Sequence, residues 1–392
     1  MKTLSRWLFS ASLLLLVGGC ATPPPPFPPA TDLFSDATFH APAQPLRTDQ
    51  LFALSPAMRA KIDNPAFRAS MRRAGPEHGL VDALYNHKEL QLDYEASVTR
   101  DAAGTFAEGK GNCLSLVIMT AAFAKALELD VIFQSVLVEE QWSRSGDIYM
   151  ASHHVNLSLP LRNAHSGART GATLTIDFLP AEDAERFGTR SIEEQTIMVM
   201  YMNNRAAEEL AAHNLDQAYW WARAAIEKDP SYVVAYNTLG VIYQRHGDMA
   251  LAERAFRRAL VHEPENTNAM SNLIPVLASL GKQAESQQLA AQLLQIQPTP
   301  PFYYFQRGMK AMREARYADA RDMFQREVKR SPYYHEFHFW LAIAHLRLGD
   351  SNEADNEITR ALDTSTSDNA TRVYSAKLAY MRAQRDSMRR LN

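Results

Sequence analysis

The hydrophobic residues of this 392-residue chain follow three different patterns from one end to the other. A continuous apolar run lies near the N-terminus. Helical spacing and then alternating spacing follow between roughly residues 46 and 190, and a 34-residue period fills the C-terminal half. These patterns predict a short leader, a mixed α+β domain with a helical first part, and an all-α array.

Four prolines mark the C-terminal period, each 34 residues after the one before: Pro230, Pro264, Pro298 and Pro332. In the unit that begins at Val233, small and bulky residues stand at the spacing of two antiparallel helices: Tyr236, Leu239, Gly240, Tyr243, Ala252, Phe256 and Ala259. The small residues allow two helices to approach closely, the bulky ones fill the space between them, and the proline ends the second helix.

The neighbouring units keep this register with some departures. Ile274 and Ser286 stand where the second unit has Gly240 and Ala252, and Thr366 replaces the proline of the fifth unit. We therefore predict five helical pairs over residues 199–366, followed by a basic capping helix over residues 367–392.

The positions of these residues resemble the tetratricopeptide repeat. The resemblance implies a solenoid whose concave groove binds a protein or peptide partner. The alternative is an array that only packs against the preceding domain. The aromatic clusters at 302–305 and 333–334 fit the repeat core better than a binding surface.

The middle region, residues 46–190, begins with apolar residues at helical spacing in 51–62, 65–73 and 80–86. A buried helix is predicted next, because the run after Asn112 is almost wholly apolar and Asn112 is a good N-cap. Residues 131–139, 148–159 and 173–179 read as three strands. Alternation in the second strand places His154 with Asn156 on a polar face, and places His153 with the apolar residues. In the third strand Asp177 also lies on the polar face.

Cys113 opens the predicted buried helix, where the helix dipole and the free N–H groups favour a thiolate. The chain has one other cysteine, Cys20, so Cys113 lacks an obvious disulfide partner if Cys20 is consumed by lipid attachment. Cys113, His154 and Asp177 together supply a nucleophile, its base and the group that orients the base.

The order of these elements resembles the transglutaminase-like core: a cysteine at the start of a buried helix, then a strand with His-Val, and then a strand with an aspartate. The resemblance implies a papain-like fold in which Cys113 is the nucleophile, His154 the general base and acid, and Asp177 its orienting group. The sequence departs from the family at Asn156, where an aromatic residue is usual, and in a longer connection over residues 162–171.

Other interpretations of these residues remain open. A buried, inert cysteine and a satisfied histidine are common in protein cores. A metal site is not expected, because adjacent histidines on opposite strand faces do not converge on an ion, and no cofactor is expected. Trp142 fits an exposed loop better than a catalytic cleft.

The N-terminus carries Lys2 and Arg6, an apolar run over residues 7–17, and small residues before Cys20. This layout predicts a signal peptide over residues 1–19, since the run is too short to span a bilayer. The ending resembles a bacterial lipobox, which implies lipidation of Cys20; Ala21 then favours a periplasm-facing place at the outer membrane. An ordinary signal peptide with a chance cysteine is the alternative. Residues 20–45, with prolines at 23–29, are predicted to form an extended tether.

Removing residues 1–19 takes away Lys2 and Arg6 and changes the formal net charge from −3 to −5. This mild acidity does not favour nucleic-acid binding. The sequence therefore predicts an envelope-anchored cysteine enzyme that hydrolyses a peptide or isopeptide amide, with repeats that bind its partner. A non-catalytic periplasmic adaptor and a crosslinking transglutaminase are the alternatives.

Overall fold

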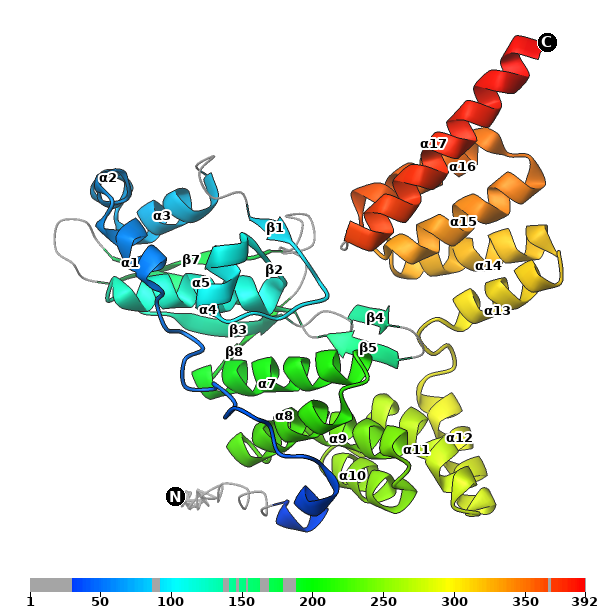
Figure 1. Cartoon of the computed structure of the whole chain (residues 1–392), viewed down its shortest axis with the longest axis horizontal. Helices are drawn as coiled ribbons and strands as arrows, with labels where there is room; N and C mark the ends of the chain where they lie inside the picture. The colour runs from blue at the N-terminus through cyan, green and yellow to red at the C-terminus, as the bar shows by residue number, and fades with distance from the viewer. Residues whose placement is uncertain are drawn as a thin grey trace, which may run out of the picture.

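The computed structural model describes residues 30–86, 92–136, 141–145, 148–152, 154–162, 169–178, 188–365 and 368–391. They form an N-terminal α+β part, called here the cysteine domain (residues 46–192), and a helical solenoid that begins at residue 194 (Figure 1). Within these ranges, none of the helices combines the length and the apolar character needed to cross a bilayer. The predicted signal peptide, Cys20 and the prolines at 23–29 lie outside the described residues.

The cysteine domain starts with helices and then builds a buried central helix. Its helices are α1 (Pro56–Asp63), α2 (Pro65–Ala74), α3 (Pro76–Val81), α4 (Ala102–Glu108) and α5 (Cys113–Ala126), and a π-helical turn spans Asp82–Asn86. α1, α2 and α3 each have proline in the first turn, a position where the missing N–H costs nothing. Almost every residue of α5 after the first is buried, as the apolar run predicts.

A four-stranded sheet lies against α5 in the order β7-β6-β3-β8, and its three strand pairs are antiparallel. The strands are β3 (Ile132–Val136), β6 (Val155–Arg162), β7 (Arg169–Ile176) and β8 (Thr189–Ile192). Val155, Leu157 and Leu159 of β6 face the core shared with α5. A short parallel pair, β1 (Asp93–Tyr94) and β2 (Lys110–Gly111), lies just before α5.

The strand predictions need correction in the middle of the domain. Residues 148–159 do not form one strand: β5 (Ile148–Ser152) pairs with β4 (Gln141–Ser145) in a separate hairpin, whereas β6 starts at Val155 and joins the larger sheet. Residues 141–145 lie in the gap between two predicted strands, yet they form β4. His154 therefore stands at the point where the chain passes from one sheet to the other.

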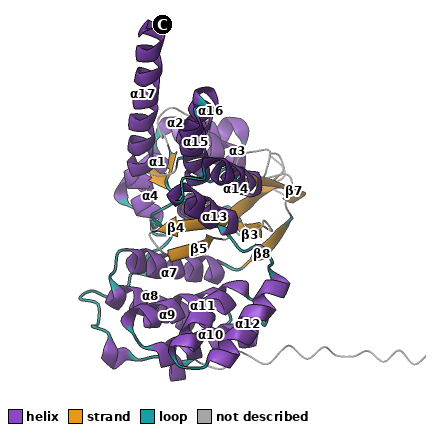
Figure 2. Cartoon of the chain, turned by 90° about the vertical axis from the view of Figure 1, so that its right-hand side faces the viewer, coloured by secondary structure: helices purple, strands orange, loops and turns teal. Residues whose placement is uncertain are grey.

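The solenoid consists of consecutive antiparallel helix pairs followed by a longer helix (Figure 2). The pairs are α7 (Glu194–Ala211) with α8 (Leu215–Lys228), α9 (Val233–His246) with α10 (Met249–His262), α11 (Thr267–Ser279) with α12 (Gln283–Ile296), α13 (Tyr303–Arg313) with α14 (Tyr317–Arg330), and α15 (His335–Leu348) with α16 (Ser351–Asp363). α17 (Asp368–Leu391) then packs against α16.

The pairs stack on one another except between α12 and α13. α8–α9, α10–α11 and α14–α15 all form interfaces, but α12 and α13 do not pack together in this way. α9 packs against α8, and three of its apolar residues are fully buried: Ala235, Leu239 and Ile242. Two periods later the corresponding residues of α13 are Tyr303, Arg307 and Lys310, and the two basic residues are exposed. Because a charged face cannot replace an apolar one in a dry interface, the stack divides into two sub-arrays at residues 297–302.

The described part of the predicted tether, residues 30–45, is not free of the folded body. Its first half packs on α8, α9 and α10, with Leu33 and Phe39 buried in the core of the first two helix pairs. The Phe39 ring stacks on Tyr219 at a centroid distance of 4.1 Å. The Tyr243 hydroxyl donates to the Leu33 carbonyl at 2.6 Å. An extended tether can therefore include only residues 20–29, which lie outside the described part.

Ionic contacts hold the same segment from its other side. Asp32 pairs with Arg254 and Arg258 of α10, each at 3.0 Å, and their guanidinium groups hold the pKa of Asp32 below its usual value despite some desolvation.

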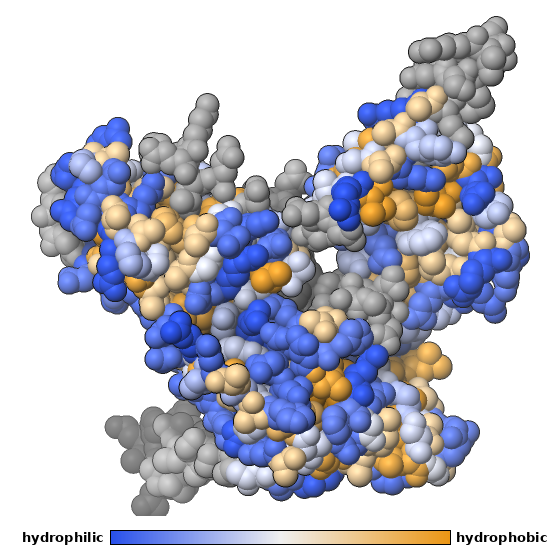
Figure 3. Space-filling view, in the orientation of Figure 1, coloured by the Kyte–Doolittle hydropathy of each residue, from blue (hydrophilic) through white to orange (hydrophobic). Residues whose placement is uncertain are grey.

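In the space-filling view, the surface of these repeats is mainly hydrophilic, with isolated apolar patches (Figure 3).

Candidate functional site

Cys113 stands in the first turn of α5, as the sequence predicts. The N-cap is Asn112, whose side-chain oxygen accepts from the Ser115 N–H at 2.9 Å. Cys113 is half-buried and forms no disulfide. The first N–H groups of a helix have no partner within the helix, so this position offers partial positive charge to a thiolate.

His154 and Asp177 are in direct contact. The His154 Nε2 atom lies 2.6 Å from Asp177 Oδ1, and only 4% of the histidine side chain is exposed. His154 precedes β6 and Asp177 directly follows β7, and these two strands are antiparallel neighbours. The sheet register thus brings together two residues that are 23 positions apart in the chain.

The Cys113 side chain completes this arrangement on the other side of the histidine. Burial alone would lower the pKa of His154, but its hydrogen bonds to Asp177 and to the Cys113 sulfur outweigh burial and raise the pKa to about 9. A histidine in this environment stays protonated at neutral pH, where it can stabilise a neighbouring thiolate. The three residues named from the sequence therefore lie in one hydrogen-bonded row.

Asn156 also contacts Asp177, a contact that its position in the sequence does not reveal. Its side-chain amide donates to Asp177 Oδ2 at 2.7 Å, on the carboxylate oxygen that His154 does not use. The side chain is almost fully buried. Asn156 therefore helps to fix the orientation of Asp177. Alternation placed Asn156 on the polar face, but only the pairing of β6 with β7 shows its partner.

Tyr94 is a second residue that sequence reasoning left without a role. β1 pairs with β2 so that Tyr94 lies beside Gly111, two residues before the cysteine. The Cys113 backbone N–H donates to the Tyr94 hydroxyl. The tyrosine ring is partly exposed, while desolvation of its hydroxyl and the nearby Cys113 sulfur raise its pKa. A hydroxyl and a backbone N–H thus meet beside the sulfur.

Several residues considered in the sequence cannot be placed. His153 and residues 163–168 of the predicted long connection lie outside the described residues, as does Cys20. Trp142 lies in β4 and not in a loop. Across the described ranges, no group of three or more histidine, cysteine or acidic residues is arranged to hold a metal ion.

In the solenoid, polar side chains link the first helix of one pair to the first helix of the next. Thr238 of α9 donates to Asn203 of α7 at 2.8 Å, and Asn272 of α11 donates to Asn237 of α9 at 3.0 Å. The predicted aromatic core is partly formed: Phe302 and Phe305 are buried, whereas Tyr333 is half exposed.

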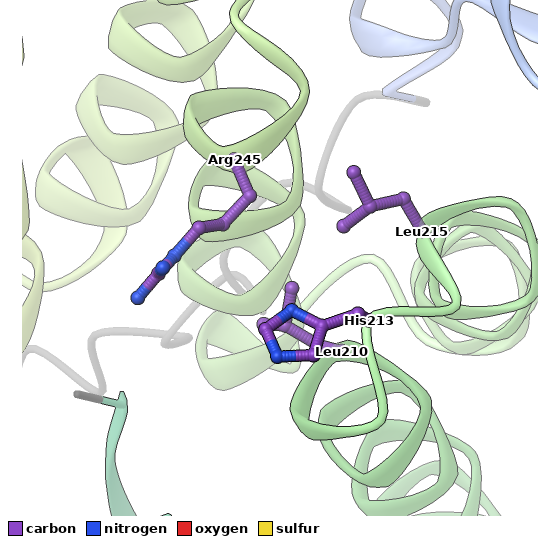
Figure 4. Close-up of a pocket in the computed structure, with 4 residues that line it drawn as sticks. All are labelled: Leu210, His213, Leu215 and Arg245. Atoms are coloured by element: carbon purple, nitrogen blue, oxygen red, sulfur yellow. The ribbon is translucent and has the colours of Figure 1, made fainter. Parts of the chain in front are cut away.

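A hollow between α7, α8 and α9 lies within the repeats (Figure 4). It is lined by Leu210, His213, Leu215 and Arg245. None of these residues belongs to the Cys113 site, so this hollow has no part in the chemistry of the thiol.

Comparison with known proteins identifies the repeats. A family model described as "Tetratricopeptide repeat" matches residues 237–301 and 305–369. No curated protein matches the chain. The C-terminal half is therefore a tetratricopeptide-type solenoid, a class of array that suggests protein–protein interaction. The family match does not extend to Cys113, His154 or Asp177.

Three solved structures illustrate what the chain is similar to. YrrB, described as a TPR protein with an unusual peptide-binding site, is 19% identical over 47% of this chain and 99% of its own, with a TM-score of 0.25. Pseudomonas aeruginosa pilF is 18% identical over 50% of this chain and 88% of its own, with a TM-score of 0.31. MamA from Desulfovibrio magneticus is 18% identical over 39% of this chain and 85% of its own, with a TM-score of 0.26.

Proposed function

We propose that the chain is a partner-binding scaffold whose repeats hold a protein or peptide. The observation that supports this role is the run of stacked helix pairs, matched by the repeat family over residues 237–301 and 305–369. The family match favours the adaptor hypothesis over the enzyme hypothesis, because it covers the solenoid and not the cysteine. The partner is expected along the first helices of the pairs, where Asn237 and Asn272 lie.

Site-specific photo-crosslinking in living cells tests the scaffold. A photoreactive amino acid at Asn272 is expected to capture one defined protein. The same group at Val261 of α10, which is 74% exposed, serves as the control position. Equal capture from both positions, or none from Asn272, would count against a partner in the groove.

A second candidate function is thiol-dependent acyl transfer, and one specific observation favours it: the hydrogen-bonded row of Cys113, His154 and Asp177. In this proposal the Cys113 sulfur forms a bond to an amide carbonyl carbon, and the carbonyl π electrons move to oxygen. The Tyr94 hydroxyl, which lies beside Cys113, is the proposed hydrogen-bond donor to that oxyanion. His154 then gives its proton to the leaving amine as the C–N bond breaks.

The resulting thioester is resolved by a second nucleophile. Water gives one proton to His154 and bonds to the thioester carbon, the C–S bond breaks so that Cys113 leaves as a thiolate, and the released carboxylic acid loses its proton to solvent, which completes hydrolysis. An amine that attacks in the same way, with loss of one proton to His154 and of the Cys113 thiolate, gives a new amide and completes transamidation. Hydrolysis of a peptide or isopeptide bond is the leading form of the proposal, and protein crosslinking the other. The transglutaminase-like fold assignment belongs to this proposal.

Acyl trapping tests this second function. The purified chain is mixed with a small activated ester and followed by intact mass spectrometry. The wild type is expected to gain a single acyl group on Cys113 and to lose it again by turnover. Cys113→Ala should gain no acyl group, and His154→Ala should be acylated at least about a hundredfold more slowly than the wild type. Equal acylation of wild type and His154→Ala would show that the histidine does not activate the thiol.

The location of the chain is also proposed. We place it at the bacterial outer membrane, facing the periplasm, through a lipid on Cys20. The support is the arrangement of charged, apolar and small residues before Cys20. Metabolic labelling with a radioactive fatty acid tests this, with Cys20→Ser as the matched control. Label that persists in Cys20→Ser, or is absent from the wild type, would exclude this anchor.

A further inference from the structure

A continuous set of hydrogen bonds joins the first helix of the solenoid to the start of the cysteine helix. The Thr99 N–H donates to Glu208 Oε1 of α7 at 2.6 Å, and the Thr99 hydroxyl also hydrogen bonds to Glu208. The same hydroxyl oxygen accepts from Asn112 Nδ2 at 2.8 Å and from Asn204 Nδ2 of α7 at 3.2 Å. Asn112 is the N-cap of α5, so only Thr99 separates the repeat from the helix that carries Cys113.

These bonds determine which way the Asn112 side chain points. Because its amide nitrogen is bound to Thr99, its oxygen is directed to the Ser115 N–H and hydroxyl, at 2.9 and 2.8 Å. The Ser115 hydroxyl in turn accepts from the Arg100 N–H at 2.9 Å. Thr99, Asn112 and Ser115 are all buried, where an unpaired polar group is costly. The cap geometry of α5 is therefore fixed from outside the helix.

The repeat register shows that the contacting face of α7 is unusual for a solenoid helix. α9, which packs against the preceding pair, has buried apolar residues at three positions: Ala235, Leu239 and Ile242. One period earlier, α7 carries polar residues at the same three positions: Tyr201, Arg205 and Glu208. Among the described residues no helix pair of the solenoid precedes α7, and Glu208 on this face contacts Thr99 of the cysteine domain. The exchange from apolar to polar residues suits a specific contact and not a continued stack.

We propose that Glu208 is a positioning residue for Cys113, a role that rests on the thiol function proposed above. Glu208 fixes Thr99, Thr99 fixes the amide of Asn112, and Asn112 holds the first turn of α5 so that the sulfur stays beside His154. The first repeat is thus part of the support of the thiol. A partner that displaces α7 would change the reactivity of Cys113.

The chain offers a matched control on the same helix. Glu208 and Glu209 both pair with Arg205, at 2.6 and 2.9 Å, and their side chains are 18% and 19% exposed. Glu209 also accepts a hydrogen bond from Asn214, in the turn between α7 and α8. Glu209→Ala therefore removes an equivalent ion pair without touching Thr99.

The experiment uses the full chain and two measurements. The first is the rate of Cys113 alkylation by iodoacetamide as a function of pH. Glu208→Ala is expected to lower the rate at neutral pH roughly tenfold and to move the profile to higher pH, because small displacements of reacting groups are costly. Glu208→Gln, which keeps an acceptor for Thr99, retains most of the wild-type rate, and Glu209→Ala stays within about twofold of wild type.

The second measurement is amide hydrogen exchange at Ser115 and Leu116. Glu208→Ala is expected to speed exchange there at least about fivefold relative to Glu209→Ala. If Glu208→Ala and Glu209→Ala behave alike in both measurements, Glu208 does not position Cys113. If the wild-type thiol reacts no faster than a peptide thiol, the proposed acyl transfer fails, while hydrogen exchange still decides the positioning role.

Discussion

His154 is held between two groups that both favour its charged form. Burial disfavours the charged imidazolium, but the protonated ring hydrogen bonds to both Asp177 and the Cys113 sulfur, and these two contacts favour the charged form. The sequence alone places His154 and Asp177 on polar strand faces, because side-chain alternation is a local property. It cannot reveal Tyr94 or the partner of Asn156, because these depend on the registers of β1 with β2 and of β6 with β7.

The pH dependence of this pair can be predicted with its sign. The pKa of His154 is raised above its unfolded value of 6.5 to about 9. Its contribution to stability is therefore fully present below pH 6.5 and is lost as the pH rises through about 9. In Asp177→Asn we expect the pKa of His154 to fall by at least about one unit, as measured by NMR of the labelled imidazole. An unchanged pKa would mean that Asp177 does not hold the proton.

Asn156 gives a second prediction at this scale. Asn156→Ala removes the amide that holds Asp177 Oδ2 and leaves a buried carboxylate oxygen without this donor. We expect the free energy of unfolding to fall by about 1–3 kcal/mol in urea titrations. Asn272→Ala, which also loses one hydrogen bond but lies in α11 of the solenoid, should leave the pKa of His154 unchanged, whereas Asn156→Ala should alter it.

At the scale of elements, each helix pair depends on complementary sizes at two positions. A Cβ on Gly240 would lie 2.5 Å from the Phe256 ring, and the same relation holds between Gly308 and Phe324. In the third pair the sizes are exchanged, with Ile274 at the glycine position and Ala290 at the phenylalanine position.

The sequence does not show that residues 148–159 form two strands, because alternation does not tell which sheet each half joins.

This complementarity predicts the effect of filling the glycine position. Gly240→Ala should lower the free energy of unfolding by about 1–3 kcal/mol, because the methyl group overlaps the Phe256 ring. In a Phe256→Leu background the same substitution should cost at least about 1 kcal/mol less, which a double-mutant cycle by urea unfolding would measure. Additive costs would mean that the two positions are not in contact.

At the scale of the whole molecule, the solenoid is enclosed at its start by other parts of the chain. The cysteine domain meets the polar face of α7, and residues 30–40 cover α8–α10. The 34-residue period predicts the helix pairs, since it is repeated in the sequence. The period does not predict the docking of residues 30–40, because a single short segment carries no period. It also does not predict the break before α13, which results from the polar residues Tyr303, Arg307 and Lys310.

The docked segment can be tested directly. Phe39→Ala removes the ring that stacks on Tyr219 and should release residues 30–45 without unfolding the repeats. Limited proteolysis should cleave this segment at least about tenfold faster, while the melting temperature changes by only a few degrees. Phe34→Ala, at a partly buried neighbour, is the matched control. Unchanged cleavage would show that the Phe39 contact does not hold the segment.

The proposal that depends most directly on the described geometry is that Cys113 is an activated thiol aligned by His154 and Asp177. The most direct measurement is the rate of Cys113 alkylation by iodoacetamide near pH 7 in the folded wild type, in His154→Ala and in a short peptide that contains the same cysteine. The account predicts that the wild type reacts at least about tenfold faster than the peptide and that His154→Ala loses this advantage. A wild-type rate no higher than that of the peptide, or reaction only after unfolding, would contradict it.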